Sequence, residues 1–515
     1  MDSLPQTIVN KIVDIVTYEY NRNERLSLVT VSKKFQHAIE QKTFKWLHLN
    51  LVRVRHASGI LSRSDRWSHV REVIFEIILP NYSEEACTRY ENDAEKAENS
   101  RVFTQNIIEM FNLLSQCPVA CATKPLTLQL SIFSETDTIR LGHTRSRGRV
   151  TQKATFTGPV PGDIRGWRYR RSKLQLDQSV RLAPIKHLRI SSFLLRKCIG
   201  LSKHHRHVDA ESVMRITSAI MQPHLKSFDC IFGDTEKIDL SRRIAHREDI
   251  AKVIDSLPRL DYFELLYEYL PPLNHDFKPP VLHNPDTQSD SVSCAIRKLT
   301  QRTKEINIYG ILGSTELFWP KDYQPGAPKP YWQSLEYLKI SYHPITPCGK
   351  WLFERDHSWR ARVMNKQLFV RPEPREGRAN EDYHAYQWRH TAIQKDMDEF
   401  YIAVGLAMAN MPKLSTLELN AINLPAWRWD EKPLHAFSFK VCSNTEAVAT
   451  WHSSPIFQPG PEVLHVWNQS AFKRGLELTI QILGRPILDG GFDKYVRDEH
   501  DDFSQSAYET SEEED

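Results

Sequence analysis

Residues 411–424 read MPKLSTLELNAINL, a phrase that follows a long apolar helix pattern and then alternates apolar with polar residues. The alternation at Leu417 and Leu419 is typical of a half-buried strand, in which every second side chain faces the core. Pro412 stops the preceding helix, because proline just beyond a helix cannot continue it. The stretch therefore predicts a unit of helix, turn and short strand.

The same unit recurs along the chain. Helix patterns are found at 101–118, 210–223, 247–258 and 389–412, and the last three end in a Pro-x-Leu step. Strand-like phrases with all or part of the skeleton Leu-x-x-Leu-x-Leu occur near Leu49, Ile74, Leu128, Leu188, Phe228, Leu257, Ile306, Leu335, Leu414 and Phe437. A helix followed by such a strand is the unit of a leucine-rich-repeat array.

The spacing between these strands varies from about 20 to nearly 80 residues, so no strict period is present. We therefore predict an α/β fold, in which residues 49–497 form an irregular leucine-rich-repeat-like solenoid with long insertions. The insertions are expected at about 140–180 and 351–389. The alternative is a compact α/β domain whose strands form one mixed sheet.

The N-terminus carries a wide apolar helix face. Pro5 can take the first helical position, where its missing N–H costs nothing. Within an arc of roughly 160° lie Ile8, Val9, Ile12, Val13, Ile15 and Val16. Asn23 and Ser32 can cap two further short helices. A unit this small buries its surface inefficiently, so we expect one side of the arc to face a partner.

These residues resemble the F-box, a three-helix adaptor-binding module, over about residues 2–48. The resemblance rests on Leu4, Pro5, Ile8, Ile12, Leu26, Leu28, Val29, Val31, Ser32, Lys33, Phe35, Ile39 and Phe44. Two features depart from the family pattern: Gln6-Thr7 replaces the usual acidic residue, and the link at 17–25 is long. The alternative is that the helices only cap the following domain.

The resemblance implies a non-catalytic, substrate-recognition subunit of a Skp–cullin–F-box-type ubiquitin ligase, of the kind with irregular repeats found in fungal F-box proteins. An F-box at 1–48 would bind the Skp adaptor, and through it cullin, while 49–497 would bind an unknown target protein. By matching position, the adaptor-binding residues are Leu4, Pro5, Ile8, Ile12, Val29, Val31 and Phe35.

A basic insertion is the first candidate for target binding. From Arg140 to Arg206 there are 17 Lys or Arg residues against Asp163 and Asp177. Basic residues mixed with aromatic ones are typical of sites for acidic or phosphorylated peptides and for nucleic acids, and also of solvated loops. The candidates are Arg165, Trp167, Arg168, Arg170 and Arg171.

An aromatic insertion at 351–389 is the second candidate, because Trp and Tyr anchor many protein interfaces. Its Trp and Tyr residues are Trp351, Trp359, Tyr383, Tyr386 and Trp388. We name Trp359, Tyr386 and Trp388 as candidate target-binding residues, with the alternative that such aromatics cover a neighbouring core.

The chain ends in a segment, 498–515, with nine acidic residues and no basic one, which is expected to be disordered. No secretory signal or apolar run of about 20 residues occurs, so we expect no membrane partner and a cytoplasmic or nuclear location.

No motif for catalysis is found: a Walker-type phosphate loop, a GxSxG elbow and an HExxH pair are all missing from the sequence. His204, His205 and His207 lack a supporting Cys or carboxylate spacing, so a solvated basic turn is favoured over a metal site. We expect neither a cofactor nor a metal.

The alternative function is a nucleic-acid or polyanion-binding protein that uses the Arg-rich insertion, with purely structural N-terminal helices. As a partner, nucleic acid ranks below a protein target.

Overall fold

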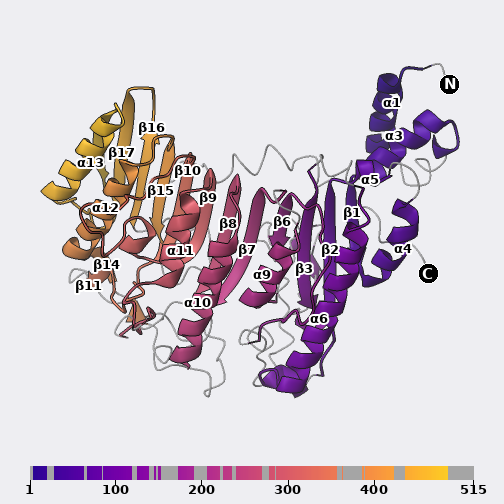
Figure 1. The fold of residues 1–515 in the computed structure, drawn as a ribbon, viewed down its shortest axis with the longest axis horizontal. Helices are drawn as coiled ribbons and strands as arrows, with labels where there is room; N and C mark the ends of the chain where they lie inside the picture. Colours follow the sequence, from indigo (N-terminus) through magenta and orange to yellow (C-terminus); the bar gives the residue numbers. More distant parts are fainter. Residues whose placement is uncertain are drawn as a thin grey trace.

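One large sheet runs through most of the molecule (Figure 1). The computed structural model describes residues 4–19, 28–62, 66–83, 85–118, 125–137, 144–146, 149–151, 172–190, 206–220, 224–234, 239–269, 278–284, 286–355, 362–363, 386–387, 389–422 and 435–484. Within these, the sheet has 12 strands, which lie side by side in the order β1 (Trp46–Asn50), β2 (Glu72–Leu79), β3 (Thr127–Ser134), β6 (His187–Ile190), β7 (Ser227–Asp234), β8 (Tyr262–Tyr269), β9 (Glu305–Leu312), β10 (Tyr337–His343), β15 (Thr416–Ala421), β16 (His435–Val441), β17 (Glu446–Ser453) and β18 (Glu477–Leu483).

The order of the strands in the sheet is their order along the chain. Every neighbouring pair is parallel except those of β16, which is antiparallel to both β15 and β17. Short two-stranded sheets pair β4 (Thr144–Ser146) with β5 (Arg149–Thr151), β11 (Phe353–Arg355) with β14 (Arg389–Ala392), and β12 (Arg362–Val363) with β13 (Tyr386–Gln387).

Helices pack against one face of the large sheet (Figure 1). They are α4 (Leu51–Leu61), α6 (Asp93–Leu114), α9 (Ala210–Ser218), α10 (Leu240–Ser256), α11 (Ser291–Thr300), α12 (Gln394–Met408) and α13 (Pro461–Lys473), with short 3-10 turns at Glu85–Thr88, Glu135–Asp137 and Thr315–Leu317. Alternate strand residues such as Phe75, Leu130 and Phe263 point into this layer and are fully buried. The main core thus lies between the helices and one sheet face.

The same hydrogen-bond pattern marks the start of successive strands. The carbonyl of Lys186, just before β6, accepts from the amides of Lys226 (2.8 Å) and Ser227 (3.2 Å), at the start of β7. Equivalent two-amide acceptors are Lys45, Leu126, Lys226, Lys304 and Glu336. The strands therefore begin level with one another, although the chain between them varies in length.

An N-terminal helical unit lies beyond β1, at one end of the sheet (Figure 1). It comprises α1 (Gln6–Glu19), residues 28–32 and α3 (Lys33–Thr43). It has its own small core, made of Val9, Val13, Phe35, Ala38 and Ile39. The helix α5 (Arg66–His69) connects this unit to the sheet.

The predicted α/β class is confirmed. All ten strand-like phrases form strands of the large sheet, and helices cover the four predicted helix patterns in part. The strands belong to one mixed sheet, as the alternative expected, while their chain order is what a repeat array requires. The helix predicted at 389–412 is too long at its start, because Arg389–Ala392 forms strand β14 and α12 begins only at Gln394.

Candidate interaction surfaces

The N-terminal helical unit holds its entry segment in place through polar contacts. Ser32 caps α3, as expected from the sequence, because its side chain accepts the Phe35 amide. Lys34 Nζ donates to the carbonyl of Leu4 at 2.7 Å, and Gln6 Nε2 donates to the carbonyl of Lys34 at 3.2 Å. These contacts fix the Leu4-Pro5 step against the start of α3.

The apolar arc of α1 divides into a buried and an exposed part. Val9 and Val13 face α3 and are fully buried. Ile8 is 43% exposed and Ile15 is 57% exposed, with the half-buried Ile12 between them by helical spacing. The helix therefore shows solvent an apolar side that its own unit does not cover.

Six of the seven predicted adaptor-binding residues lie at or near the surface. Val31 is 40% exposed, Pro5 is exposed, and Leu4 and Val29 are half-buried, in addition to Ile8 and Ile12. Phe35 differs, because only 3% of it is exposed and its ring packs in the core of the unit. We therefore correct its predicted role: Phe35 supports the exposed residues from beneath.

The predicted target-binding residues fall mainly outside the described residues. These are Arg165, Trp167, Arg168, Arg170, Arg171, Trp359 and Trp388, and the acidic segment 498–515 lies outside as well. Tyr386 belongs to β13, where its backbone pairs with Val363. Trp351 is 7% exposed and stacks on the Arg389 guanidinium, 4.9 Å from the ring centre, so this aromatic covers the core.

The second face of the large sheet, opposite the helices, carries polar residues across its middle and, beside them, the buried apolar residues Phe133, Ile231 and Leu266. Its middle is a row of register partners, here called the central row: Arg189, Asp229, Glu264, Asn307, Lys339 and Glu418. Arg189 Nε donates to Asp229 Oδ2 at 3.0 Å, and Lys339 Nζ lies 3.2 Å from Glu418 Oε2. Sequence reasoning missed this row, although the polar residues alternate with the core residues of the predicted strands.

The two neighbouring carboxyl groups of the central row are costly to ionise. Burial raises the pKa of Asp229 to about 7, the charge of Glu264 adds to the rise, and Arg189 opposes it. Burial also raises the pKa of Glu264, against the hydrogen bond from the Tyr262 hydroxyl. Strongly perturbed carboxyl groups of this kind cluster at functional sites.

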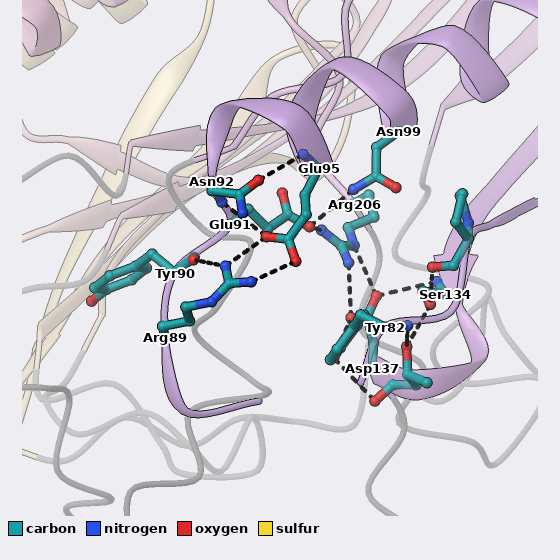
Figure 2. A network of polar contacts seen from close by, with 12 residues as sticks. Tyr82, Arg89, Tyr90, Glu91, Asn92, Glu95, Asn99, Ser134, Asp137 and Arg206 are labelled. Atoms are coloured by element: carbon teal, nitrogen blue, oxygen red, sulfur yellow. Dashed lines mark hydrogen bonds and ion pairs between the residues drawn. The ribbon is translucent and has the colours of Figure 1, made fainter. Parts of the chain in front are cut away.

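A buried ionic network connects Arg206 with Glu91 and Asp137 (Figure 2). Arg206 forms a fork with Asp137, at 2.8 Å from Nε to Oδ2 and 2.9 Å from Nη2 to Oδ1, and also pairs with Glu91. The Tyr82 hydroxyl donates to Asp137 at 2.9 Å. Asp137 lies just after β3 and Arg206 lies shortly before α9, so the network ties together the chain segments that adjoin these two elements.

The prediction of a solvated basic turn is wrong for Arg206 and His207, while His204 and His205 lie outside the described residues. Arg206 is 2% exposed, and His207 is 3% exposed with its Nε2 atom 2.7 Å from Glu268 Oε2. Sequence reasoning missed these partners, because Glu91 and Asp137 lie far from Arg206 in the chain. Across the described ranges, no group of three or more His, Cys, Asp and Glu side chains could hold a metal ion.

Comparison with known proteins finds no match among protein-family models, curated proteins or solved structures. Among the helices of the described part, none is long and apolar enough to cross a membrane.

Proposed function

We propose that this chain is a substrate-recognition subunit of a Skp–cullin–F-box-type ubiquitin ligase. The N-terminal helical unit binds the Skp adaptor, and the region around the large sheet binds a target protein. The chain itself performs no chemistry. It raises the effective concentration of target lysines near the conjugating enzyme, which is catalysis by proximity.

The observation that carries the proposal is the exposed apolar set on the N-terminal helical unit. Ile8, Ile15 and Val31 are each at least 40% exposed, although the unit has a core of its own to fill. Apolar side chains on one side of a short helix are the usual anchors of helix-face docking. The resemblance of these positions to the F-box supplies the occupant, the Skp adaptor.

The sheet supports the second half of the proposal. Strands in chain order, with helices on one face and a repeated hydrogen-bond pattern at their starts, are what an irregular leucine-rich-repeat-like array needs. Such arrays leave a long face for a protein partner. Here the second face carries no helix of the described part, and its central row is charged.

Co-purification with a Skp adaptor tests the proposal. We expect Leu4→Asp with Ile8→Asp to abolish co-purification, because two charges would enter an apolar interface. The matched control, Thr7→Asp with Asn10→Asp, adds the same charge to the same helix and keeps the acceptor for Gln6 at position 10. Failure of the intact protein to bind, or equal binding by both double variants, would show the proposal to be wrong.

A further inference from the structure

The side-chain oxygens of Asp229, Glu264 and Asn307 lie on neighbouring strands and accept fewer hydrogen bonds than they could. Asp229 Oδ1 and Asn307 Oδ1 are buried and have no hydrogen-bond partner. Between them in the register, Glu264 accepts one hydrogen bond, from the Tyr262 hydroxyl. A buried acceptor left unpaired costs about 1–3 kcal/mol, so these oxygens form a site that gains from a donor-rich ligand.

Both cations of the central row already have carboxylate partners. Arg189 donates Nε to the other oxygen of Asp229, and its Nη1 atom lies 3.9 Å from Glu72 Oε1. Lys339 pairs with Glu418, on the side away from Asn307. Neither therefore supplies a donor to the free oxygens of Asp229 and Asn307.

The surrounding face has an excess of negative charge. Among the strand residues from β2 to β10, the second face carries two cations, Arg189 and Lys339, against six carboxyl groups: Glu72, Glu76, Asp229, Glu264, Glu268 and Glu305. An acidic face attracts a basic partner and repels a phosphorylated or nucleic-acid one. The charge of the face and its unpaired acceptors therefore both favour a cationic ligand that is rich in hydrogen-bond donors.

We propose that the central row binds an arginine side chain in a basic segment of the target protein. A guanidinium presents five N–H donors in a planar fork, which can reach Asp229, Glu264 and Asn307 on three adjacent strands. Asp229 is a short side chain that lies between the longer Arg189 and Glu264 in the register and is 2% exposed. The identity of the partner as a ubiquitylation target rests on the proposed function. The binding of an arginine side chain by these residues does not depend on that function.

The test uses the full-length protein without adaptor and a photoreactive octa-arginine peptide as the probe, at about 0.15 M salt to screen distant charges. We expect cross-links in peptides that contain β7, β8 or β9. We expect Asp229→Asn with Glu264→Gln to weaken binding by about tenfold or more. The control, Glu446→Gln with Glu477→Gln, removes the same charge from two register partners on the same face at the end of the sheet and should change affinity less than about twofold.

A second variant distinguishes loss of the binding site from misfolding of the double variant. Asn307→Lys places an ammonium group beside the two carboxylates from within the chain, so it should prevent probe binding without emptying the site. Equal loss in the test and control pairs, or full binding by Asn307→Lys, would overturn the proposal. Co-purification of the intact protein with the adaptor distinguishes this failure from a failure of the proposed function. If only the present inference is wrong, the same variants still co-purify with the adaptor.

Discussion

Arg66 of α5 places its Nη2 atom 2.7 Å from Oε1 of Glu40 on α3, and this ion pair joins the N-terminal helical unit to the sheet. Both side chains are less than one-fifth exposed. Beside the pair, His37 and His69 meet edge to face with ring centres 4.8 Å apart. On the proposed function, this joint sets the direction in which an adaptor-bound unit would hold the target-binding sheet.

Arg66→Ala should loosen the joint. We expect faster hydrogen exchange in α1 and α3 and a loss of about 1–3 kcal/mol for the unit, because charged hydrogen bonds in partly buried sites are worth this much. The control is Arg101→Ala, which removes an exposed pair with Glu98 on α6. Unchanged exchange in α3 would show that the pair does not hold the unit.

The same pair should make the joint sensitive to acid. The hydrogen bond from Arg66 lowers the pKa of Glu40 below its ordinary value of 4.5. A lowered folded-state pKa adds stability that is fully present above 4.5 and is lost as pH falls through the lowered value. The stability difference between the protein and Arg66→Ala, followed by hydrogen exchange, should therefore shrink below about pH 4.5; an equal difference at about pH 3 would contradict the assignment.

Arg206→Met should be strongly destabilising, because it removes the cation that pairs with the buried carboxyl groups of Glu91 and Asp137. We expect a loss of about 3 kcal/mol or more in urea unfolding. Arg215→Met is the control, since its pair with Glu211 is exposed and should be worth less than about 1 kcal/mol. Similar midpoints for the two variants would contradict the structural role given to the network.

Gly310 illustrates a position where only glycine fits. Its φ is +80°, and an added Cβ would lie 2.2 Å from the Tyr267 carbonyl oxygen. Gly475 has a similar φ of +72° and open space around it. We therefore expect Gly475→Ala to cost about 1–2 kcal/mol for the backbone alone, and Gly310→Ala to cost clearly more in urea unfolding. Equal costs would mean that the strand absorbs the clash.

Asp229→Asn should stabilise the protein in a pH-dependent way. Because the folded pKa of Asp229 is raised to about 7, ionising this group costs stability as pH rises from about 4 to 7. The neutral amide avoids that cost, so we expect a gain of roughly 1–3 kcal/mol at pH 8 and little change at about pH 3, below both the unfolded and the folded pKa. A carboxylate retained at such a cost fits a binding role better than a structural one; a loss of stability at pH 8 would count against the site.

The strands were predictable where leucine, isoleucine and phenylalanine mark the core face, as at Leu417 and Leu419. The strand β17 was not predicted, because its core-facing residues Ala447 and Ala449 are only weakly apolar. β18 did carry a usable signal, since Leu478, Ile480 and Ile482 alternate. The helices α4, α11 and α13 were also missed.

Pairs that depend on the fold could not be predicted. Arg206 and Glu91 are 115 residues apart, and Arg189 and Asp229 are 40 apart. No local pattern connects such residues, because the strand register brings them together only after the sheet has formed. The exposed side of α1 was predictable, since its helical spacing depends on neighbouring residues alone, whereas the burial of Phe35 depends on how α3 packs.

The chain-ordered sheet has a consequence for how the molecule is made. Each strand finds its partner in the strand synthesised just before it, so structure can grow from the N-terminus while the later strands are still being translated. The N-terminal helical unit and β1 with β2 are complete first. On the proposed function, an adaptor could therefore bind Ile8 and Val31 while the later strands of the sheet are still being made.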